Sequence, residues 1–325
     1  MQAVVLVGGQ GTRLRPLTAD IPKPVVPLVD RPFISYLIEW LDGHGVDEVV
    51  LACGFLPDAL RDVLGEGEPG GPRLTWVVEP EPRGTAGAIK HAEPHLRDRF
   101  LALNGDVLSD LDLTSLIRFH EESGALATLG LHPVEEPGSY GLVRRELGGE
   151  VTEFVEKPDE RSSVATGEVN AGTYVLEREV LDRVPPGRSV SIERELFPRM
   201  AGSGLYGLRL EGYWMDIGTP DRYLQATWDI LEGRVRTRVE PHPDAVLVAP
   251  GAEVDPGATV GPRAVVSAGS KVADGAEITG SVLLDGCRVG QGATVRGSIL
   301  SPGVLVAPGA EVAGATVGSD ERVAA

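Results

Sequence analysis

The chain has 325 residues, of which 42% are hydrophobic and 24% are charged. This length and composition indicate a folded protein with room for one large domain and a smaller one, and they argue against disorder. The net charge of −18 at pH 7 excludes a protein that wraps nucleic acid or lies on an anionic lipid surface. Any nucleotide that the protein binds is therefore expected to be a small one.

The cysteine content and the hydropathy pattern indicate the cellular compartment of the protein. Cys53 and Cys287 form no C-x-x-C spacing, so neither a disulfide framework nor a zinc site is expected. No basic leader precedes the first short apolar run, and no apolar stretch is long enough to span a bilayer. We expect a cytoplasmic protein with no membrane partner.

Short apolar runs alternate with helical patterns in the first part of the chain. Strands are expected at 3–7, 48–52, 74–78 and 100–103, and helices at 32–44, 57–64, 86–93 and 113–123. This alternation predicts a mostly parallel sheet with helices on both faces. Ligands of such sheets bind beyond the carboxyl ends of the strands. The segments that follow strands, at 8–18, 79–87 and 104–106, should therefore meet along one edge.

The segment 8–18 after the first strand reads Gly-Gly-Gln-Gly-Thr-Arg-Leu-Arg-Pro-Leu-Thr. Its glycines allow a tight turn and a close approach to a ligand, so that amide N–H groups can point at phosphate oxygens. Arg13 and Lys23 add positive charge. The pattern is neither the Walker nor the Rossmann type, because no Gly-Lys-Ser/Thr follows and residue 14 is leucine. We predict an anion site here, with a plain glycine-rich turn as the simpler alternative.

Two aspartates are candidate metal ligands. Asp106 follows a predicted strand in Asn-Gly-Asp-Val, where an Asx turn or a helix cap is the simpler interpretation. Asp216 lies between apolar residues in Tyr-Trp-Met-Asp-Ile-Gly, and a carboxylate in such surroundings needs a partner or a metal. Two converging aspartates and phosphate oxygens would suit Mg²⁺.

The last third of the chain has a different texture. A helix is expected to begin at Thr219-Pro220 and to end near Gly233, and a linker to follow at 234–246. Aliphatic residues then recur every six positions from Val248 to Leu284, and the series resumes after slips at Val289. A six-residue period with small corner residues predicts a parallel β-helix over 247–325.

The segment 8–18 and the following Lys23-Pro24 resemble the signature of the sugar-phosphate nucleotidyltransferases, a G-G-x-G-T-R-L-x-P-L-T loop followed by a K-P lysine. The Gly-Asp at 105–106 and the Trp-Met-Asp-Ile-Gly at 214–218 resemble the two metal-binding motifs of that family. Segments 84–87, 140–141, 153–158 and 170–172 resemble its nucleotide-side and sugar-side motifs. The resemblance covers residues 1 to about 231, and the subgroup that it approaches most closely acts on mannose 1-phosphate with GTP.

The resemblance implies a fold and a set of site residues. The fold is α/β, with a Rossmann-like mixed-sheet nucleotidyltransferase domain at 1–233 followed by a left-handed parallel β-helix. The implied catalytic residues are Arg13, Lys23 and Lys157. The implied nucleotide-binding residues are Gly8, Gly9, Gly11, Thr12, Glu79, Gly84, Thr85 and Asp106. The implied residues for the sugar phosphate are Gly141, Glu156, Lys157 and Asn170, and Asp106 and Asp216 would hold Mg²⁺.

The implied reaction is attack of mannose 1-phosphate on GTP, which gives GDP-mannose and pyrophosphate. The same chemistry with another pair, such as glucose or heptose 1-phosphate with UTP or dTTP, stays open, as does a catalytically silent relative that senses nucleotide sugars. Some hexapeptide β-helices transfer acyl groups with a histidine, but His242 is the last histidine of this chain. We therefore expect a structural coil that supports a homo-oligomer.

Overall fold

The computed structural model describes residues 1–9, 11–19, 21–54, 56–134, 142–155 and 167–325. The chain divides into two compact units, which are described separately. Unit 1 comprises 1–9 and 37–214, and unit 2 comprises 10–36 and 215–325. The limits of these units differ from those of the domains that we expect from the sequence, at 1–233 and 247–325 with a linker at 234–246. Those domain limits stay a prediction.

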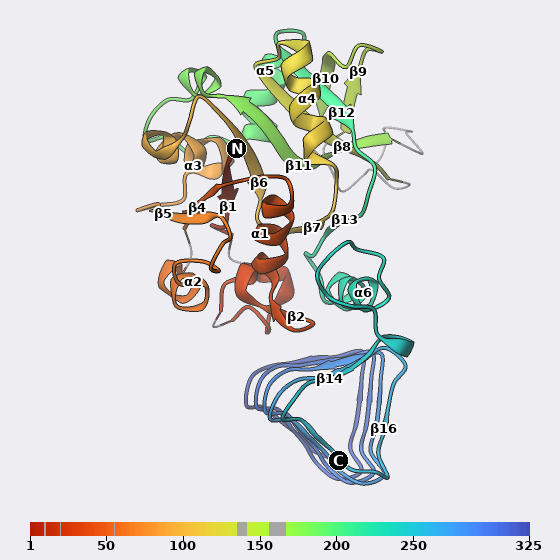
Figure 1. Ribbon diagram of the computed structural model, residues 1–325. Coiled ribbons are helices and arrows are strands. Elements are labelled where there is room, and N and C mark those ends of the chain that lie inside the picture. Colours follow the sequence, from red (N-terminus) through yellow and green to blue (C-terminus); the bar gives the residue numbers. More distant parts are fainter. Residues whose placement is uncertain (10, 20, 55, 135–141, 156–166) are drawn as a thin grey trace. The chain divides into compact units, whose positions relative to one another are not determined.

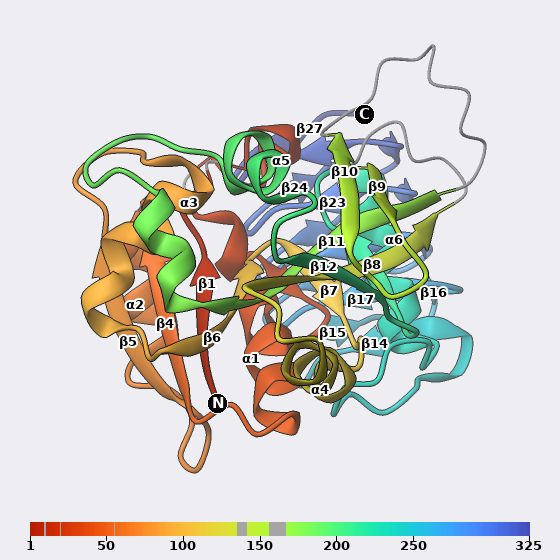
Figure 2. The ribbon, with the colours of Figure 1, turned by 90° about the horizontal axis from the view of Figure 1, so that it is seen from above.

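A nine-stranded mixed sheet forms the centre of unit 1, with main path β10-β9-β11-β6-β1-β4-β5; β8 pairs with β11, and β12 pairs with β8 (Figures 1 and 2). β1 runs parallel to β4 and β6, whereas β11 runs antiparallel to β6. The strands are β1 (Gln2–Leu6), β4 (Glu48–Cys53), β5 (Arg73–Val78), β6 (Arg99–Asn104), β8 (Ala127–Val134), β9 (Leu142–Arg145), β10 (Val151–Val155), β11 (Gly167–Glu177) and β12 (Leu205–Arg209). The predicted α/β class is confirmed.

Helices pack on this sheet through alternate strand residues. Val4 of β1 and Val50 of β4 share one buried cluster with Ile89 of α3. The helices of the unit are α2 (Pro57–Leu64), α3 (Gly84–Ala92), α4 (Leu113–Ser123) and the short α5 (Phe197–Met200), and α1 (Phe33–Gly43) begins in unit 2 and ends in unit 1. α3 begins two residues before the predicted start, because the Val190 carbonyl accepts hydrogen bonds from the first-turn amides of Ala86 and Gly87.

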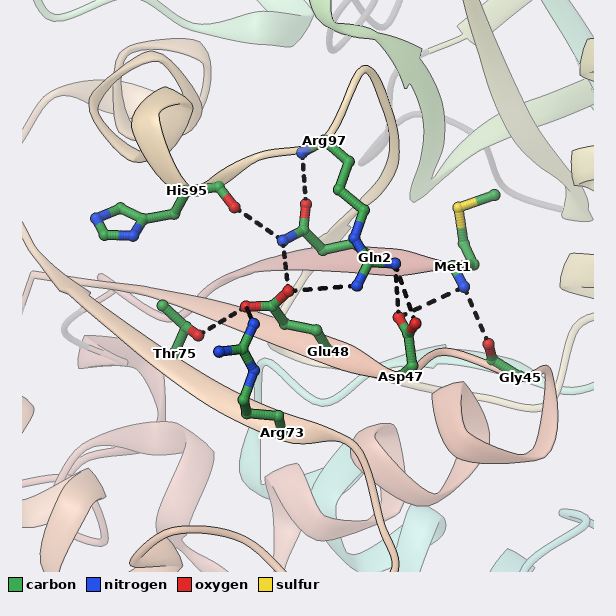
Figure 3. Close-up of polar contacts among 9 residues, drawn as sticks. All are labelled: Met1, Gln2, Gly45, Asp47, Glu48, Arg73, Thr75, His95 and Arg97. Atoms are coloured by element: carbon green, nitrogen blue, oxygen red, sulfur yellow. Dashed lines mark hydrogen bonds and ion pairs between the residues drawn. The ribbon is translucent and has the colours of Figure 1, made fainter.

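A polar network fills the amino-terminal edge of the sheet, where β1, β4 and β5 begin (Figure 3). The buried carboxylate of Glu48 accepts hydrogen bonds from Gln2 Nε2 at 3.0 Å, Arg73 Nη2 at 2.7 Å and Thr75 Oγ1 at 2.9 Å. Gln2 Oε1 also accepts a hydrogen bond from the Arg97 amide at 2.7 Å. Burial raises the pKa of Glu48, but the hydrogen bonds from Thr75, Arg73 and Gln2 outweigh it, so the pKa lies below its usual value.

Unit 2 joins the segment 10–36 to the part of the chain that follows residue 214. The short elements of that segment are two 3₁₀ turns, η1 (Thr12–Leu14) and η2 (Lys23–Val25), and the strand pair β2 (Pro27–Leu28) and β3 (Arg31–Pro32). Helix α6 (Pro220–Leu231) follows β13 (Trp214–Asp216) and begins as expected, because Thr219 Oγ1 caps it. The Tyr223 hydroxyl donates to the Pro27 carbonyl at 2.6 Å, which fixes α6 to the segment.

The carboxyl-terminal part of unit 2 is a coil of three parallel sheets, drawn as stacked, nearly triangular turns in Figure 1. This is the arrangement expected of a left-handed parallel β-helix. One sheet contains β14 (Val246–Val248), β17 (Ala264–Val266), β20 (Ser281–Leu283), β23 (Ile299–Leu300) and β26 (Thr316–Val317). The second contains β15 (Glu253–Val254), β18 (Lys271–Val272), β21 (Arg288–Val289), β24 (Leu305–Val306) and β27 (Arg322–Val323). The third contains β16 (Thr259–Val260), β19 (Glu277–Thr279), β22 (Thr294–Arg296) and β25 (Glu311–Ala313).

At one position, the residue that faces the interior of the coil differs from the one that the six-residue period predicts. Leu283, not Leu284, pairs with Val266 and lies in the interior cluster. The corner at Gly280 is shorter than the preceding corner at Gly261-Pro262-Arg263, and Gly280 turns it in the left-handed region with φ 58°. This shorter corner is the physical origin of the slip in the six-residue period.

One face of the coil is covered. Val265, Val282 and Ile299 alternate with the inward residues of the β14 sheet, so they point outward, yet each is only 1% exposed. Within unit 2 the coil also approaches the segment 10–36, because a Cβ built on Gly318 would lie 3.5 Å from Pro16 Cβ. No helix among the described residues has the length and apolar character needed to cross a bilayer.

Candidate active site

Three cationic side chains surround the carboxylate of Asp216 in unit 2. Lys23 Nζ lies 3.6 Å from Asp216 Oδ1, and Arg13 Nη2 and Arg222 Nη1 lie 3.7 and 3.5 Å from Oδ2. The Asp216 side chain is 18% exposed and that of Arg13 is 65% exposed. Taken by themselves, these four side chains carry more positive than negative charge in a strongly acidic protein, which is the electrostatic character that phosphate groups require.

The backbone conformation of the glycine-rich segment and of the turn after it places Arg13 and Lys23 near Asp216. Gly11 adopts the left-handed conformation, with φ 59° and ψ 29°, immediately before η1, and the Thr18 hydroxyl donates to its carbonyl at 2.7 Å. A Cβ on Gly11 would lie 3.1 Å from Lys23 Cβ, so glycine allows the two parts of the segment to approach. Lys23 is only 6% exposed, and its position in the turn after Pro22 holds the ammonium group near Asp216.

Two further residues of this cluster have roles that the sequence reasoning did not assign. A Cβ on Gly218 would lie 2.7 Å from Arg13 Nη2, so the glycine of the Trp-Met-Asp-Ile-Gly motif makes room for the guanidinium group. Arg222 was missed entirely. The only sequence signal for it is its place in the first turn of α6, directly after the Thr219-Pro220 start of the helix.

In unit 1, strand ends of the parallel sheet bring Gly8, Gly54 and Glu79 together. A Cβ on Gly8 would lie 3.4 Å from the Gly54 nitrogen and 3.5 Å from Glu79 Oε1, so these positions form a closely packed backbone cradle. Glu79 is 9% exposed and accepts the Arg83 amide at 3.0 Å. Burial raises the pKa of Glu79, against the opposing effect of the Arg83 amide. Gly9 next to the cradle is exposed.

Asp106 directly follows β6 and lies in unit 1. The amide of Gly105 donates to the Leu6 carbonyl at 3.0 Å, and a Cβ at Gly105 would lie 2.7 Å from that oxygen. The chain can therefore cross the end of β1 only with glycine at this position. Asp106 itself is partly exposed, next to this crossing.

The sugar-side motif at 170–172 lies against the same strand ends. Asn170 Oδ1 accepts the Gly172 amide at 3.0 Å, and Gly172 has φ 69°. A Cβ on Gly172 would lie 2.7 Å from Asn104 Nδ2, so this turn packs directly on the residue before Gly105 and Asp106. The Trp214 indole donates to the Ala171 carbonyl at 2.8 Å, which ties the turn to the segment that leads to Asp216.

Gly84 and Thr85 lie in the first turn of α3, before the predicted start of that helix at residue 86. The Thr85 hydroxyl donates to Glu193 Oε2 at 2.8 Å and accepts the Ile192 amide at 2.7 Å. A Cβ on Gly84 would lie 2.7 Å from the Val190 carbonyl oxygen. The motif therefore serves at least to dock α3 on the segment around residue 190.

Some predicted site residues are not brought together within one unit. Gly8, Gly9, Glu79, Asp106 and Asn170 belong to unit 1, whereas Gly11, Thr12, Arg13, Lys23 and Asp216 belong to unit 2. Thr12 is exposed at the start of η1. The predicted residues Gly141, Glu156 and Lys157 lie outside the described residues.

The donors present fit the chemistry of a hard divalent cation but do not form a complete site on their own. Asp106 and Asp216 offer carboxylate oxygens, and Mg²⁺ typically takes one or two carboxylates together with substrate phosphates. Among the residues that the structure describes, no three His, Cys, Asp or Glu side chains gather into a metal-binding group.

Neither cysteine is a candidate nucleophile. Burial raises the pKa of Cys53 and of Cys287 to about 12, so both thiols stay protonated at neutral pH. Cys53 is fully buried beside Gly54 in the cradle, so its role there is packing.

Comparison with known proteins bears on what this arrangement does. Residues 2–233 match the family model described as nucleotidyl transferase, and residues 242–324 match the GMPPB C-terminal domain. The chain belongs to the nucleotidyl transferase family.

Relatives in this family include two enzymes that cover most of the chain. The mannose-1-phosphate guanylyltransferase of Mycobacterium tuberculosis is 37% identical over 88% of this chain and 80% of its own length. The mannose-1-phosphate guanylyltransferase catalytic subunit beta of Xenopus tropicalis is 40% identical over 77% of this chain and 69% of its own length. A crystal structure of HddC from Yersinia pseudotuberculosis, complexed with GMP-PN, has a TM-score of 0.62 and 29% identity, and the match covers 70% of this chain and 99% of that one.

The match to the nucleotidyl transferase model spans residues 2–233, which include the cation cluster in unit 2 and the strand-end cradle in unit 1. Enzymes of this family generally use a divalent metal. The chain is therefore an enzyme of nucleotidyl transfer.

Proposed function

We propose that the protein transfers a guanylyl group from GTP to mannose 1-phosphate and releases pyrophosphate. The observation that carries this proposal is the cluster of Arg13, Lys23 and Arg222 around Asp216, because it supplies positive charge where the family signature predicts phosphate binding. The relatives named mannose-1-phosphate guanylyltransferase support the choice of sugar phosphate, and the relative complexed with GMP-PN supports the choice of guanine.

The proposed step is a direct displacement. A phosphate oxygen of mannose 1-phosphate attacks the α-phosphorus of GTP, a new P–O bond forms, and the bond between the α-phosphorus and the bridging oxygen breaks. The bridging oxygen leaves with the β- and γ-phosphates as pyrophosphate. No covalent enzyme intermediate is required, which agrees with the protonated, buried state of Cys53.

Both substrates are anionic, so the main task of the protein is to reduce their repulsion and to orient them. Arg13, Lys23 and Arg222 would neutralise the triphosphate, and backbone amides at Gly8, Gly9, Gly11 and Thr12 would contact its oxygens. Lys157 and Glu156, with Gly141 and Asn170, stay the predicted residues for the sugar phosphate. Removing one such electrostatic donor typically costs on the order of 100- to 1,000-fold in rate.

The assignment of Mg²⁺ to Asp106 and Asp216 stays a prediction that the oxygen donors support. When bound, the metal would neutralise phosphate charge. The residues of this chain would hold and orient the phosphates. Asp216→Asn is expected to weaken the Mg²⁺ dependence of the rate, and Asp221→Asn, at an exposed position in the first turn of α6, is the matched control. An unchanged Mg²⁺ titration in Asp216→Asn would remove that residue from the metal site.

Guanine differs from the other bases in presenting N1–H and N2–H₂ donors together, which require acceptors from the protein. Glu79 is the proposed acceptor, because its carboxylate lies beside Gly8 at the strand-end cradle. Discrimination of this kind can be large, since the wrong base leaves a buried acceptor unpaired.

The assay that tests the proposal measures pyrophosphate release over a panel of nucleotides and sugar phosphates. GTP, UTP and dTTP are each combined with mannose, glucose and heptose 1-phosphates. We expect the highest kcat/KM with GTP and mannose 1-phosphate. A higher value with another pair would reassign the substrates, and no release with any pair would favour a silent, nucleotide-sugar-sensing role.

The surroundings of the reaction are also proposals. We place the enzyme in the cytoplasm, where its two buried thiols stay reduced, and we expect a homo-oligomer formed through the coil. Light scattering of the purified chain measures the oligomeric state, and a monomer at micromolar concentration would contradict that expectation.

A further inference from the structure

The segment Ser191-Ile192-Glu193-Arg194-Glu195 has no role in the function proposed above, although Glu193 accepts a hydrogen bond from Thr85 of the nucleotide-side motif. Residues Ile192–Leu196 form a π-helix. Such turns are rare and often occur at functional sites. The side chain of Glu193 is half-buried and points back into unit 1, where it has partners from two other elements.

Glu193 connects the nucleotide-side motif to a buried tyrosine. Its Oε2 accepts hydrogen bonds from the Thr85 hydroxyl at 2.8 Å and from the Ser191 hydroxyl at 3.0 Å. Its Oε1 accepts the Tyr174 hydroxyl at 3.4 Å, and Tyr174 is fully buried in β11. Charge-assisted hydrogen bonds of this kind are stronger than neutral ones.

The connection continues to the sugar-side motif. The Tyr174 hydroxyl accepts a hydrogen bond from Asn170 Nδ2 at 2.8 Å, and Asn170 Oδ1 in turn accepts the Gly172 amide at 3.0 Å. An uninterrupted chain of side-chain hydrogen bonds therefore runs from Thr85 through Glu193 and Tyr174 to Asn170. We call these four residues the relay.

Both ends of the relay are held by close backbone packing. At one end, the amides of Ala86 and Gly87 donate to the Val190 carbonyl at 2.9 and 3.2 Å, so the first turn of α3 moves with the segment that carries Glu193. At the other end, Gly172 packs on Asn104, directly before Gly105 and Asp106. Both ends of the relay are therefore anchored to the backbone that leads to the predicted site residues.

We propose that Glu193 is a positioning residue that couples the nucleotide and sugar-phosphate subsites through the relay. The relay is complete in this structure. Binding of the nucleotide at the Gly84-Thr85 end stabilises this arrangement, and Asn170 is thereby held in place for the sugar phosphate. Such coupling is reciprocal, so each ligand raises the affinity for the other by the same factor. This inference rests on the proposed function, because it assigns the two ends of the relay to the two substrates.

The test measures coupling directly at equilibrium, with no turnover. Calorimetry in Mg²⁺ buffer gives the Kd of mannose 1-phosphate in the absence and in the presence of a GTP analogue whose α- and β-phosphorus atoms are joined by a methylene group. The ratio of the two constants is the coupling factor, which we expect to be about fivefold or more in the wild type.

Three variants interrupt the relay at different points: Thr85→Val, Glu193→Gln and Tyr174→Phe. Each variant is expected to reduce the coupling factor to about twofold or less, even though Thr85 and Tyr174 bond different oxygens of the Glu193 carboxylate. Glu195→Gln is the matched control, because Glu195 belongs to the same π-helix and its polar partners among the described residues are the Ser191 amide and Arg199, neither of which belongs to the relay. It should keep the wild-type factor.

The outcomes separate the inference from the proposed function. If the wild type binds neither ligand, the proposed function fails and the inference fails with it. If the wild type binds both ligands without coupling, or if the folded variants keep the wild-type factor, the relay inference alone is overturned. Should Tyr174→Phe not fold, Thr85→Val and Glu193→Gln, both at partly exposed positions, decide the question.

Discussion

The ammonium group of Lys23 lies 3.6 Å from the carboxylate of Asp216, although the two residues are 193 positions apart in the sequence. Asp216 has two other cationic partners, Arg13 and Arg222, so it compensates only part of the positive charge that surrounds it. This relationship supplies the first prediction, because Lys23 can be removed without leaving Asp216 unpaired.

Lys23→Ala should lower kcat by on the order of 100- to 1,000-fold, which corresponds to about 3–4 kcal/mol of lost electrostatic stabilisation. The fold should persist, since Arg13 and Arg222 still pair with Asp216. Steady-state kinetics and thermal unfolding of the same preparation check both statements. Lys271→Ala is the control, because Lys271 lies on the coil and pairs with Glu253. Normal turnover by Lys23→Ala would exclude Lys23 from the site.

Gly218→Ala should impair activity while leaving stability nearly unchanged. The added Cβ would lie 2.7 Å from Arg13 Nη2, and the end of a long, exposed arginine can move aside with little loss of stability. The guanidinium group then leaves its position beside Asp216, so the rate falls. Gly43→Ala, where a Cβ meets nothing within 4 Å, is the matched control. Equal rates for the two variants would show that the position of Arg13 is unimportant.

Glu79→Gln should make the protein more stable at pH 7 and less selective for GTP. Burial raises the pKa of Glu79, so the ionised carboxylate destabilises the folded state as pH rises through that pKa. Below the unfolded value of about 4.3 the penalty disappears. The difference in Tm between variant and wild type should therefore be positive at pH 7 and shrink toward pH 4.

Glu81→Gln is the control for this experiment, because the Glu81 side chain is 70% exposed. Its Tm should follow that of the wild type across the same pH range. A Glu79→Gln variant that is less stable than the wild type at pH 7, or that prefers GTP as strongly, would contradict the role given to Glu79.

Glu48→Gln should have the opposite pH dependence. Although burial raises the pKa of Glu48, the hydrogen bonds in Figure 3 hold it below its usual value, so the ionised group stabilises the folded state above the unfolded pKa. Loss of these charge-assisted bonds should reduce the free energy of unfolding at pH 7 by about 1–3 kcal/mol. The difference should vanish as pH falls through the folded pKa. Denaturant unfolding at several pH values measures it, with the exposed Glu66→Gln as control; a constant difference would contradict this account.

The sequence predicted those parts of the structure that depend on local periodicity. The alternation of strands and helices up to residue 123 and the six-residue period after Val248 both reflect which side chains are buried, and the structure confirms them. The six-residue period placed Leu284 in the interior of the coil, whereas the structure places Leu283 there. The period alone does not reveal that the corner at Gly280 is shorter.

The remaining features depend on tertiary contacts that have no local pattern. Arg222 was missed because an arginine in the first turn of a helix is ordinary until its distance to Asp216 is known. The start of α3 at Gly84 depends on the Val190 carbonyl, which comes from a distant segment. The connection of Thr85 to Asn170 through Glu193 likewise required coordinates, because three separate segments contribute to it.

The measurement that tests the central claim most directly is ³¹P NMR of the wild-type enzyme with GTP, mannose 1-phosphate and Mg²⁺. The account predicts that the signals of GTP and mannose 1-phosphate decline together, while pyrophosphate and the diphosphate of GDP-mannose appear in equal amounts. Free phosphate with GDP, or unchanged substrate signals, would contradict it.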